Sequence, residues 1–254
     1  MSKTNIYLGT VALEINRWSS RIPSFSVSGW LDKIRAAGFD GIELWENHVL
    51  LSENEAEKIK DSGFPVGVYN HYGIFTNSDT ALRTKAADMI RFLDAGAVKY
   101  NIGNNPDLLA EYKENVLRFA ESLPDNCVLL CECHAGTLLE NDNAVEDFFK
   151  GLCPQKFAMI IHPFAEPETL RSKFERFGNR IAHIHSQYSY DNKRIRLERQ
   201  PEQVAACFDI LKEYGYNGSF TIEFSELTAE PGENIDDLFA NTVLDLSYIR
   251  RNFT

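Results

Sequence analysis

The stretch AAGFDGIELW, residues 36–45, joins the end of an expected helix to a short apolar strand through Gly38. The same helix–glycine–strand pattern recurs in DSGFPVGVY (61–69), DAGAVKYNI (94–102) and EYGYNGSFTIE (213–223). In each segment a glycine follows the last helical turn, where a left-handed residue commonly ends a helix, and an apolar strand begins soon after. These junctions predict repeated βα units on a parallel sheet.

The alternation of strand and helix patterns continues along the whole chain. Eight runs rich in β-branched and aromatic residues predict strands at residues 5–12, 41–45, 65–69, 97–101, 127–133, 157–161, 180–185 and 218–223. Apolar residues at helical spacing predict helices between them, the clearest at residues 28–37, 80–93, 108–122 and 201–214. Eight such units in 254 residues, with no glycine-rich nucleotide loop, predict the α/β class and a single (β/α)8 TIM barrel domain over residues 1–254.

Composition narrows the class of protein. The net charge of −11 disfavours the phosphate-neutralising surface that nucleic-acid binding requires. No apolar run reaches the length of about 18 residues that spans a bilayer, and the first residues, MSKTNIYLG, lack the apolar core of a signal peptide. Five cysteines, three of them within residues 127–133, indicate reduced thiols. We therefore expect a cytoplasmic protein that binds a small molecule and neither nucleic acid nor a membrane; the sequence leaves homo-oligomerisation open.

Carboxylate and imidazole side chains stand at the carboxyl ends of the predicted strands. Burying such groups in a barrel is unfavourable unless they meet one another or a metal ion at its mouth. The group comprises Glu43, His71, Glu132, His134, His162, His183, His185 and Glu223. Alternation along a strand puts Glu132 and His134 on one face and Cys131 and Cys133 on the other. Two carboxylates with two imidazoles suit a divalent transition metal, and carboxylates paired with a structural arginine or lysine are the alternative.

These segments resemble the xylose-isomerase-like TIM barrel superfamily, which includes sugar phosphate isomerases and epimerases and the AP endonucleases of family 2, such as endonuclease IV. The resemblance rests on AAGFDGIELWENH (36–48), ECHAGTL (132–138), RIAHIHS (180–186) and GYNGSFTIE (215–223), in that order around eight βα units. It implies one divalent metal ion held by Glu132, His162, His185 and Glu223. In IIHPF (160–164), His162 replaces the usual aspartate. An imidazole there favours Mn²⁺, Co²⁺ or Zn²⁺ over Mg²⁺.

The resemblance implies a metal-dependent isomerase or epimerase of a sugar, polyol or related hydroxy-carbonyl compound. Glu132 and Glu223 would exchange the proton of the carbon beside the carbonyl through an enediolate. Substrate contacts are predicted for His134, His71, Trp45 and Glu43. The alternatives are a hydrolase or lyase like endonuclease IV, and a metal-free barrel that binds a ligand. The basic run DNKRIRLER (191–199) is predicted to be a solvated turn, with anion binding by Lys193, Arg194, Arg196 and Arg199 as its alternative.

Overall fold

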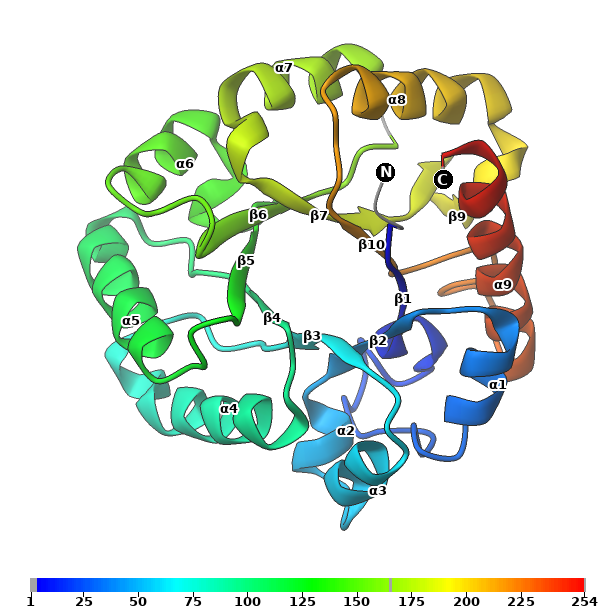
Figure 1. Ribbon diagram of the computed structural model, residues 1–254, viewed down its shortest axis with the longest axis horizontal. Coiled ribbons are helices and arrows are strands. Elements are labelled where there is room, and N and C mark those ends of the chain that lie inside the picture. The colour runs from blue at the N-terminus through cyan, green and yellow to red at the C-terminus, as the bar shows by residue number, and fades with distance from the viewer. Residues whose placement is uncertain (1–3, 165, 254) are drawn as a thin grey trace.

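Eight parallel strands close into a barrel in the computed structural model, which describes residues 4–164 and 166–253 (Figure 1). Around the barrel the strands follow the order β1, β10, β7, β6, β5, β4, β3, β2. Their bounds are β1 (Ile6–Gly9), β2 (Gly41–Trp45), β3 (Val66–Asn70), β4 (Ala97–Tyr100), β5 (Val128–Glu132), β6 (Phe157–Ile161), β7 (Ile181–Ser186) and β10 (Ser219–Ile222). The predicted α/β class and (β/α)8 TIM barrel are confirmed. Residues 1–3, 165 and 254 lie outside the described residues. The expected domain 1–254 includes all of them, and the segment MSKTNIYLG includes residues 1–3.

Helices ring the barrel and bury one face each against the strands (Figure 1). They are α1 (Leu31–Ala37), α2 (Asn47–Leu50), α3 (Glu55–Asp61), α4 (Thr80–Leu93), α5 (Leu109–Glu121), α6 (Asp142–Phe149), α7 (Pro167–Phe177), α8 (Pro201–Glu213) and α9 (Ile235–Asn252). Short 3-10 turns cover Thr10–Leu13, Asn77–Asp79, Pro106–Leu108, Leu138–Glu140, Gly178–Arg180 and Leu197–Arg199. None of the helices in the described part of the chain is both long and apolar enough to cross a membrane.

The prediction of a first strand over residues 5–12 is wrong for residues 10–12. β1 ends at Gly9, and Thr10–Leu13 form a 3-10 turn. The backbone at Gly9 lies so close to β10 that an added Cβ would stand 3.1 Å from the carbonyl oxygen of Ile222. The chain leaves the strand direction at Thr10, whose hydroxyl accepts a hydrogen bond from the Trp45 amide at 2.9 Å. The turn is apolar and buried, so its pattern is typical of a strand although its backbone is not extended.

The barrel interior divides into an apolar plug and a polar layer above it. Alternate residues of a strand face inward, so the two layers stand two residues apart along each strand. The plug is formed by Val68, Ala97, Leu130, Ala158 and Ile160. Two residues nearer the carboxyl ends of the same strands stand Asn70, Lys99, Glu132 and His162. The polar layer therefore rests on a dry, packed floor.

The basic run 191–199 forms part of a small hairpin after β7. Strands β8 (Tyr188–Tyr190) and β9 (Lys193–Ile195) pair antiparallel. Asp191 and Asn192 connect them, and their φ angles of 51° and 58° fit a tight turn with two left-handed residues. The expectation of a simple solvated turn missed this hairpin, because its strands are too short to show an alternating pattern.

Asp245 of α9 forms hydrogen bonds to the segments that follow β9 and β10. It accepts a hydrogen bond from the Leu197 amide at 2.8 Å and another from the Ser225 hydroxyl. The side chain is 3% exposed. Burial raises its pKa from 3.8 to about 7, although both hydrogen bonds and nearby Arg196 act in the opposite direction.

We expect Asp245→Asn to make the free energy of unfolding less dependent on pH. Unfolded Asp245 loses its proton near pH 4, whereas the folded protein keeps it until about pH 7, so the penalty grows as pH rises between these values and is complete above them. Asparagine cannot ionise, yet it can accept from the Leu197 amide and donate to Ser225. Urea denaturation should show the variant gaining about 3 kcal/mol more at pH 8 than at pH 5. A difference that does not grow with pH would contradict the assignment.

Candidate functional site

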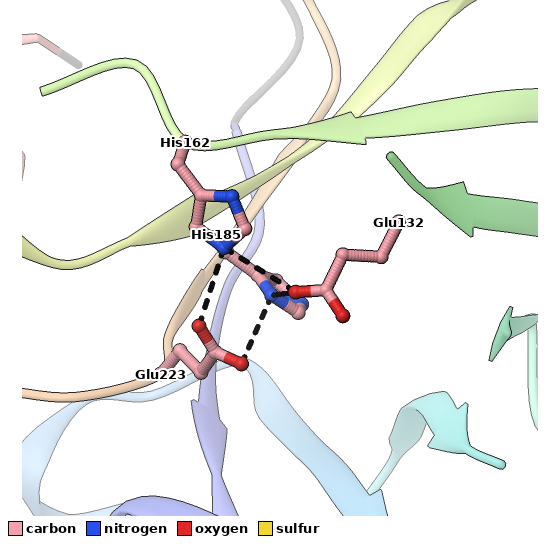
Figure 2. Close-up of side chains that lie close together, drawn as sticks. All are labelled: Glu132, His162, His185 and Glu223. Carbon is pink, nitrogen blue, oxygen red and sulfur yellow. Dashed lines mark hydrogen bonds and ion pairs between the residues drawn. The ribbon is translucent and has the colours of Figure 1, made fainter. Parts of the chain in front are cut away.

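Four side chains converge at the carboxyl ends of strands that lie side by side in the barrel (Figure 2). They are Glu132 of β5, His162 after β6, His185 of β7 and Glu223 after β10. One nitrogen or oxygen atom from each lies within 4.8 Å of the others. His162 Nε2 is 3.3 Å from Glu132 Oε1 and 3.4 Å from Glu223 Oε2. His185 Nδ1 is 3.1 Å from Glu132 Oε1 and 3.3 Å from Glu223 Oε1.

This arrangement fits a divalent transition-metal ion. Ligand atoms about 2.1 Å from a tetrahedral ion lie about 3.4 Å from one another, which is close to the separations found here. His162 Nε2 and Glu223 Oε2 are buried and lie 3.4 Å apart, close enough for an ion pair, but neither atom makes a hydrogen bond of good geometry to a described residue. Two imidazoles and two carboxylates form a nitrogen and oxygen donor set suited to Zn²⁺, Co²⁺ or Mn²⁺. The residues expected to be metal ligands are thus brought together, with donor atoms facing a common centre.

The four groups carry opposite charges that stabilise one another. Burial raises the pKa of both carboxyl groups, but neighbouring positive charge outweighs it. Lys99 and the two histidines hold the pKa of Glu132 well below its usual value, and His185 with His162 lowers that of Glu223 to about 2. Burial lowers the pKa of His162 and His185, but the carboxylates raise both overall. A metal ion binding here would therefore replace protons on the imidazoles.

Glu43 of β2 lies beneath His185 and orients its ring. His185 Nε2 donates to Glu43 Oε2 at 3.0 Å, and Asn70 Nδ2 donates to Glu43 Oε1 at 2.9 Å. Burial acts to raise the pKa of Glu43, but His185 and His183 lower it overall. Because Nε2 is engaged below, Nδ1 faces the other three ligands. A carboxylate behind a ligating histidine fixes its orientation and strengthens metal binding.

His183 lies deeper in the barrel and is satisfied by hydroxyl groups. Its Nδ1 is 2.8 Å from Ser219 Oγ, and its Nε2 is 2.9 Å from Thr221 Oγ1. Burial lowers its pKa, although Glu43 acts in the opposite direction. Of the two histidines of IAHIHS, His185 therefore lies among the four converging side chains and His183 lies below them.

Lys99 is a member of the polar layer that the sequence reasoning missed. Its Nζ lies 2.7 Å from Glu132 Oε2, and its side chain is 3% exposed. Asn101 Nδ2 donates to the same oxygen at 3.2 Å, and the ring of Tyr72 lies 4.7 Å from the ammonium. The available signal was a lysine inside the buried run AVKYN, where a charge requires a partner.

The residues expected to contact substrate lie at different depths. His134 reaches the mouth, with a side chain 41% exposed and Nε2 3.7 Å from Glu132 Oε2. Trp45 is 1% exposed and packs in a cluster with Val11 and Phe224. His71 lies outside the barrel, because inward-facing Asn70 precedes it. Its Nδ1 is 2.7 Å from Glu46 Oε2, and its ring packs against Phe119 of α5.

The β8–β9 hairpin brings one of its basic side chains toward the site. Arg194 lies over the Phe224 ring at 5.6 Å and interacts electrostatically with Glu223. The other basic residues of this run meet carboxylates: Arg196 and Arg199 contact Glu226, and Lys193 contacts Glu230. Arg194 is therefore the basic residue of this run placed to meet a ligand at the mouth.

A cavity of about 250 Å³ opens beside His162. It is bounded by the loops after β5 and β6 and by α7, and its lining residues are Cys133, His134, Ala135, Ile161, His162, Pro163, Glu166, Thr169, Leu170 and Lys173. Its volume is sufficient for part of a small organic molecule next to the four-residue group.

Comparison with known proteins establishes the fold of this chain. No protein-family model matches it, and no curated protein sequence is significantly similar. A xylose isomerase-like TIM barrel protein from Mycobacterium smegmatis, solved in complex with magnesium, is 13% identical with a TM-score of 0.69, over 99% of this chain and 98% of that one. An L-ribulose 3-epimerase is 16% identical with a TM-score of 0.73, over 99% and 95%. An IOLI protein with a bound zinc atom is 11% identical with a TM-score of 0.70, over 98% and 99%.

The matched structures span nearly the whole barrel in both directions. The chain thus has the xylose-isomerase-like TIM barrel fold, as the sequence resemblance indicated. At these identities the likeness concerns the fold, so the activity must be argued from the residues at the mouth.

We expect Glu43→Gln to weaken metal binding about 10- to 100-fold while leaving all four proposed ligands in place. The amide cannot supply the negative charge that orients and polarises His185. Titration of metal-free protein with Zn²⁺ against a competing chelator measures the effect. Glu57→Gln, on the exposed face of α3, is the matched control and should bind as wild type does. Equal affinities for the two variants would mean that Glu43 does not support the site.

Proposed function

We propose that this protein is a metal-dependent isomerase or epimerase that moves a proton on a sugar, polyol or related hydroxy-carbonyl compound. The observation that carries the proposal is the convergence of Glu132, His162, His185 and Glu223 on one centre at the barrel mouth. The fold supports it, because barrels of this shape include an L-ribulose 3-epimerase and a D-psicose 3-epimerase.

Mn²⁺, Co²⁺ or Zn²⁺ is the cofactor that this donor set favours, and the four residues above would hold one such ion. When bound, it would polarise neighbouring carbonyl and hydroxyl oxygens of the substrate and so acidify the intervening C–H bond. His162 in place of a carboxylate leaves the ligand set with two negative charges, which disfavours Mg²⁺.

Glu132 and Glu223 are the proposed acid/base pair. They project from β5 and β10, which are separated around the barrel by β6 and β7, so a substrate between them presents a different face to each carboxylate. One carboxylate accepts the proton from the carbon beside the carbonyl, giving an enediolate. For the second step the other residue must be protonated in the substrate complex, as a carboxylic acid. Transfer of its proton to the opposite face inverts that carbon, whereas transfer to the neighbouring carbon, with a proton shift between the two substrate oxygens, isomerises the substrate.

The surrounding residues would orient the substrate and keep water away. Exposed His134 can donate to a substrate hydroxyl at the rim, and Arg194 can approach an oxygen from the hairpin side. The apolar plug excludes water from below. Glu43 would act through His185, and the buried positions of Trp45 and His71 favour packing roles over direct substrate contact.

The alternatives are weaker on specific grounds. A hydrolase like endonuclease IV would have to bind phosphodiesters with a net charge of −11, and would need a centre with more than one metal ion. A metal-free binding barrel does not explain why two imidazoles and two carboxylates converge on one centre at the mouth. Cytoplasmic location and homo-oligomerisation stay predictions.

Metal content and proton exchange test the proposal together. Protein purified without chelator and refilled with Mn²⁺, Co²⁺ or Zn²⁺ should hold one ion per chain. It should also exchange deuterium from solvent into at least one of a panel of ketoses and inososes, followed by NMR. Chelated protein should lose the exchange, and restored metal should recover it. Absence of stoichiometric metal would refute the site assignment.

Glu132→Gln and Glu223→Gln should each abolish exchange, because each keeps side-chain size but removes a carboxylate that is both ligand and base. Acid/base catalysis alone contributes about 10²- to 10⁴-fold. Cys131→Ala is the control on the neighbouring outward-facing position, and it should lower stability by about 1 to 3 kcal/mol while retaining exchange. The mechanism would be overturned if the two glutamine variants still exchanged deuterium while folded, metal-loaded Cys131→Ala did not.

A further inference from the structure

The two oxygens of Glu132 face different surroundings. Oε1 is directed to the proposed metal centre, 3.1 Å from His185 Nδ1 and 3.3 Å from His162 Nε2. Oε2 faces away from it, 2.7 Å from Lys99 Nζ and 3.2 Å from Asn101 Nδ2. A carboxylate so placed can hold a cation on each oxygen, and here the second position belongs to an ammonium group.

We infer that Lys99 restricts the centre to a single divalent ion by occupying the position on Glu132 where a second ion would bind. The inference rests on the proposed function, since it concerns the same metal centre. It assigns to Lys99 a role that determines which chemistry the barrel can perform.

Charge and burial support this role. The Lys99 side chain is 3% exposed and its ammonium is bracketed by Glu132 and the Tyr72 ring. A divalent ion on Oε2 would have to sit beside this positive charge in a site shielded from water, where repulsion is strong. The remaining groups around Oε2 are Asn101 and His134, whose Nε2 lies 3.7 Å away. His134 could help to hold a second ion only if the ammonium were absent, and Asn101 only if its side chain also turned to present the amide oxygen in place of Nδ2.

The consequence concerns substrate class. In-line displacement at a phosphodiester commonly uses two ions that stabilise the attacking and leaving oxygens, whereas enolisation of a hydroxy-carbonyl compound needs one. Lys99 therefore biases the centre toward proton transfer on hydroxy-carbonyl substrates and away from phosphodiester hydrolysis.

Counting bound ions tests the inference without any substrate. Wild-type protein, Lys99→Arg and Lys99→Met are saturated with Mn²⁺, freed of unbound metal and analysed by elemental analysis and electron paramagnetic resonance. Wild type and Lys99→Arg should hold one ion with an isolated Mn²⁺ spectrum. Lys99→Met should gain a second ion and show spin coupling between the two. Adding His134→Ala to Lys99→Met should return the count to one.

Lys173→Met is the matched control, because Lys173 lies at the rim of the neighbouring cavity but pairs with Asp142 of α6. It should hold one ion. Two coupled ions in wild type, or a single ion in folded Lys99→Met, would overturn the inference. If Lys99→Met does not fold, Lys99→Gln, which also removes the ammonium but keeps a polar side chain, takes its place in the same comparison. No ion in any folded protein would instead refute the proposed metal site, and this inference with it.

Discussion

The structure depends on the mutual neutralisation of charges buried inside the barrel. Glu43, Glu132 and Glu223 would each be strongly destabilising alone in a dry interior. They are compensated by His162, His185 and Lys99, which lie within 2.7 to 3.4 Å of carboxylate oxygens. Removing one member leaves its partner uncompensated, so this layer constrains every strand that contributes to it. The same property makes the layer suited to a metal ion, whose charge can replace that of the imidazole protons.

The fold delivers these groups through strand alternation. Inward positions of the barrel strands hold an apolar plug first and charged residues two positions later, so charge appears where the barrel opens. Glu43 from β2 engages His185 from β7 across the interior, and Lys99 from β4 engages Glu132 from β5. The proposed metal ligands therefore stand on or directly after rigid strands that are packed from below, which would suit a metal centre.

Patterns along the sequence predicted the barrel and most strand bounds, because glycine-marked junctions and apolar runs are local signals. The position of Glu132, His185 and Glu223 at the barrel mouth was also predictable, since charged residues at the ends of buried strands are conspicuous. Two placements near the site were not predicted. His71 faces outward, because Val68 and Asn70 are the inward-facing residues of β3 and successive residues of a strand alternate between its faces. Lys99 looked like an ordinary strand residue, since its partner Glu132 is distant in sequence and only the closed barrel brings the two together.

Anomalous diffraction from a crystal grown with Mn²⁺ or Zn²⁺ would test the central claim most directly. The account predicts one anomalous peak per chain, about 2.0 to 2.2 Å from one atom each of Glu132, His162, His185 and Glu223. Lys99 should remain against the outer oxygen of Glu132. A crystal with saturating metal but no peak between these four side chains, or with a peak held by other residues, would contradict it.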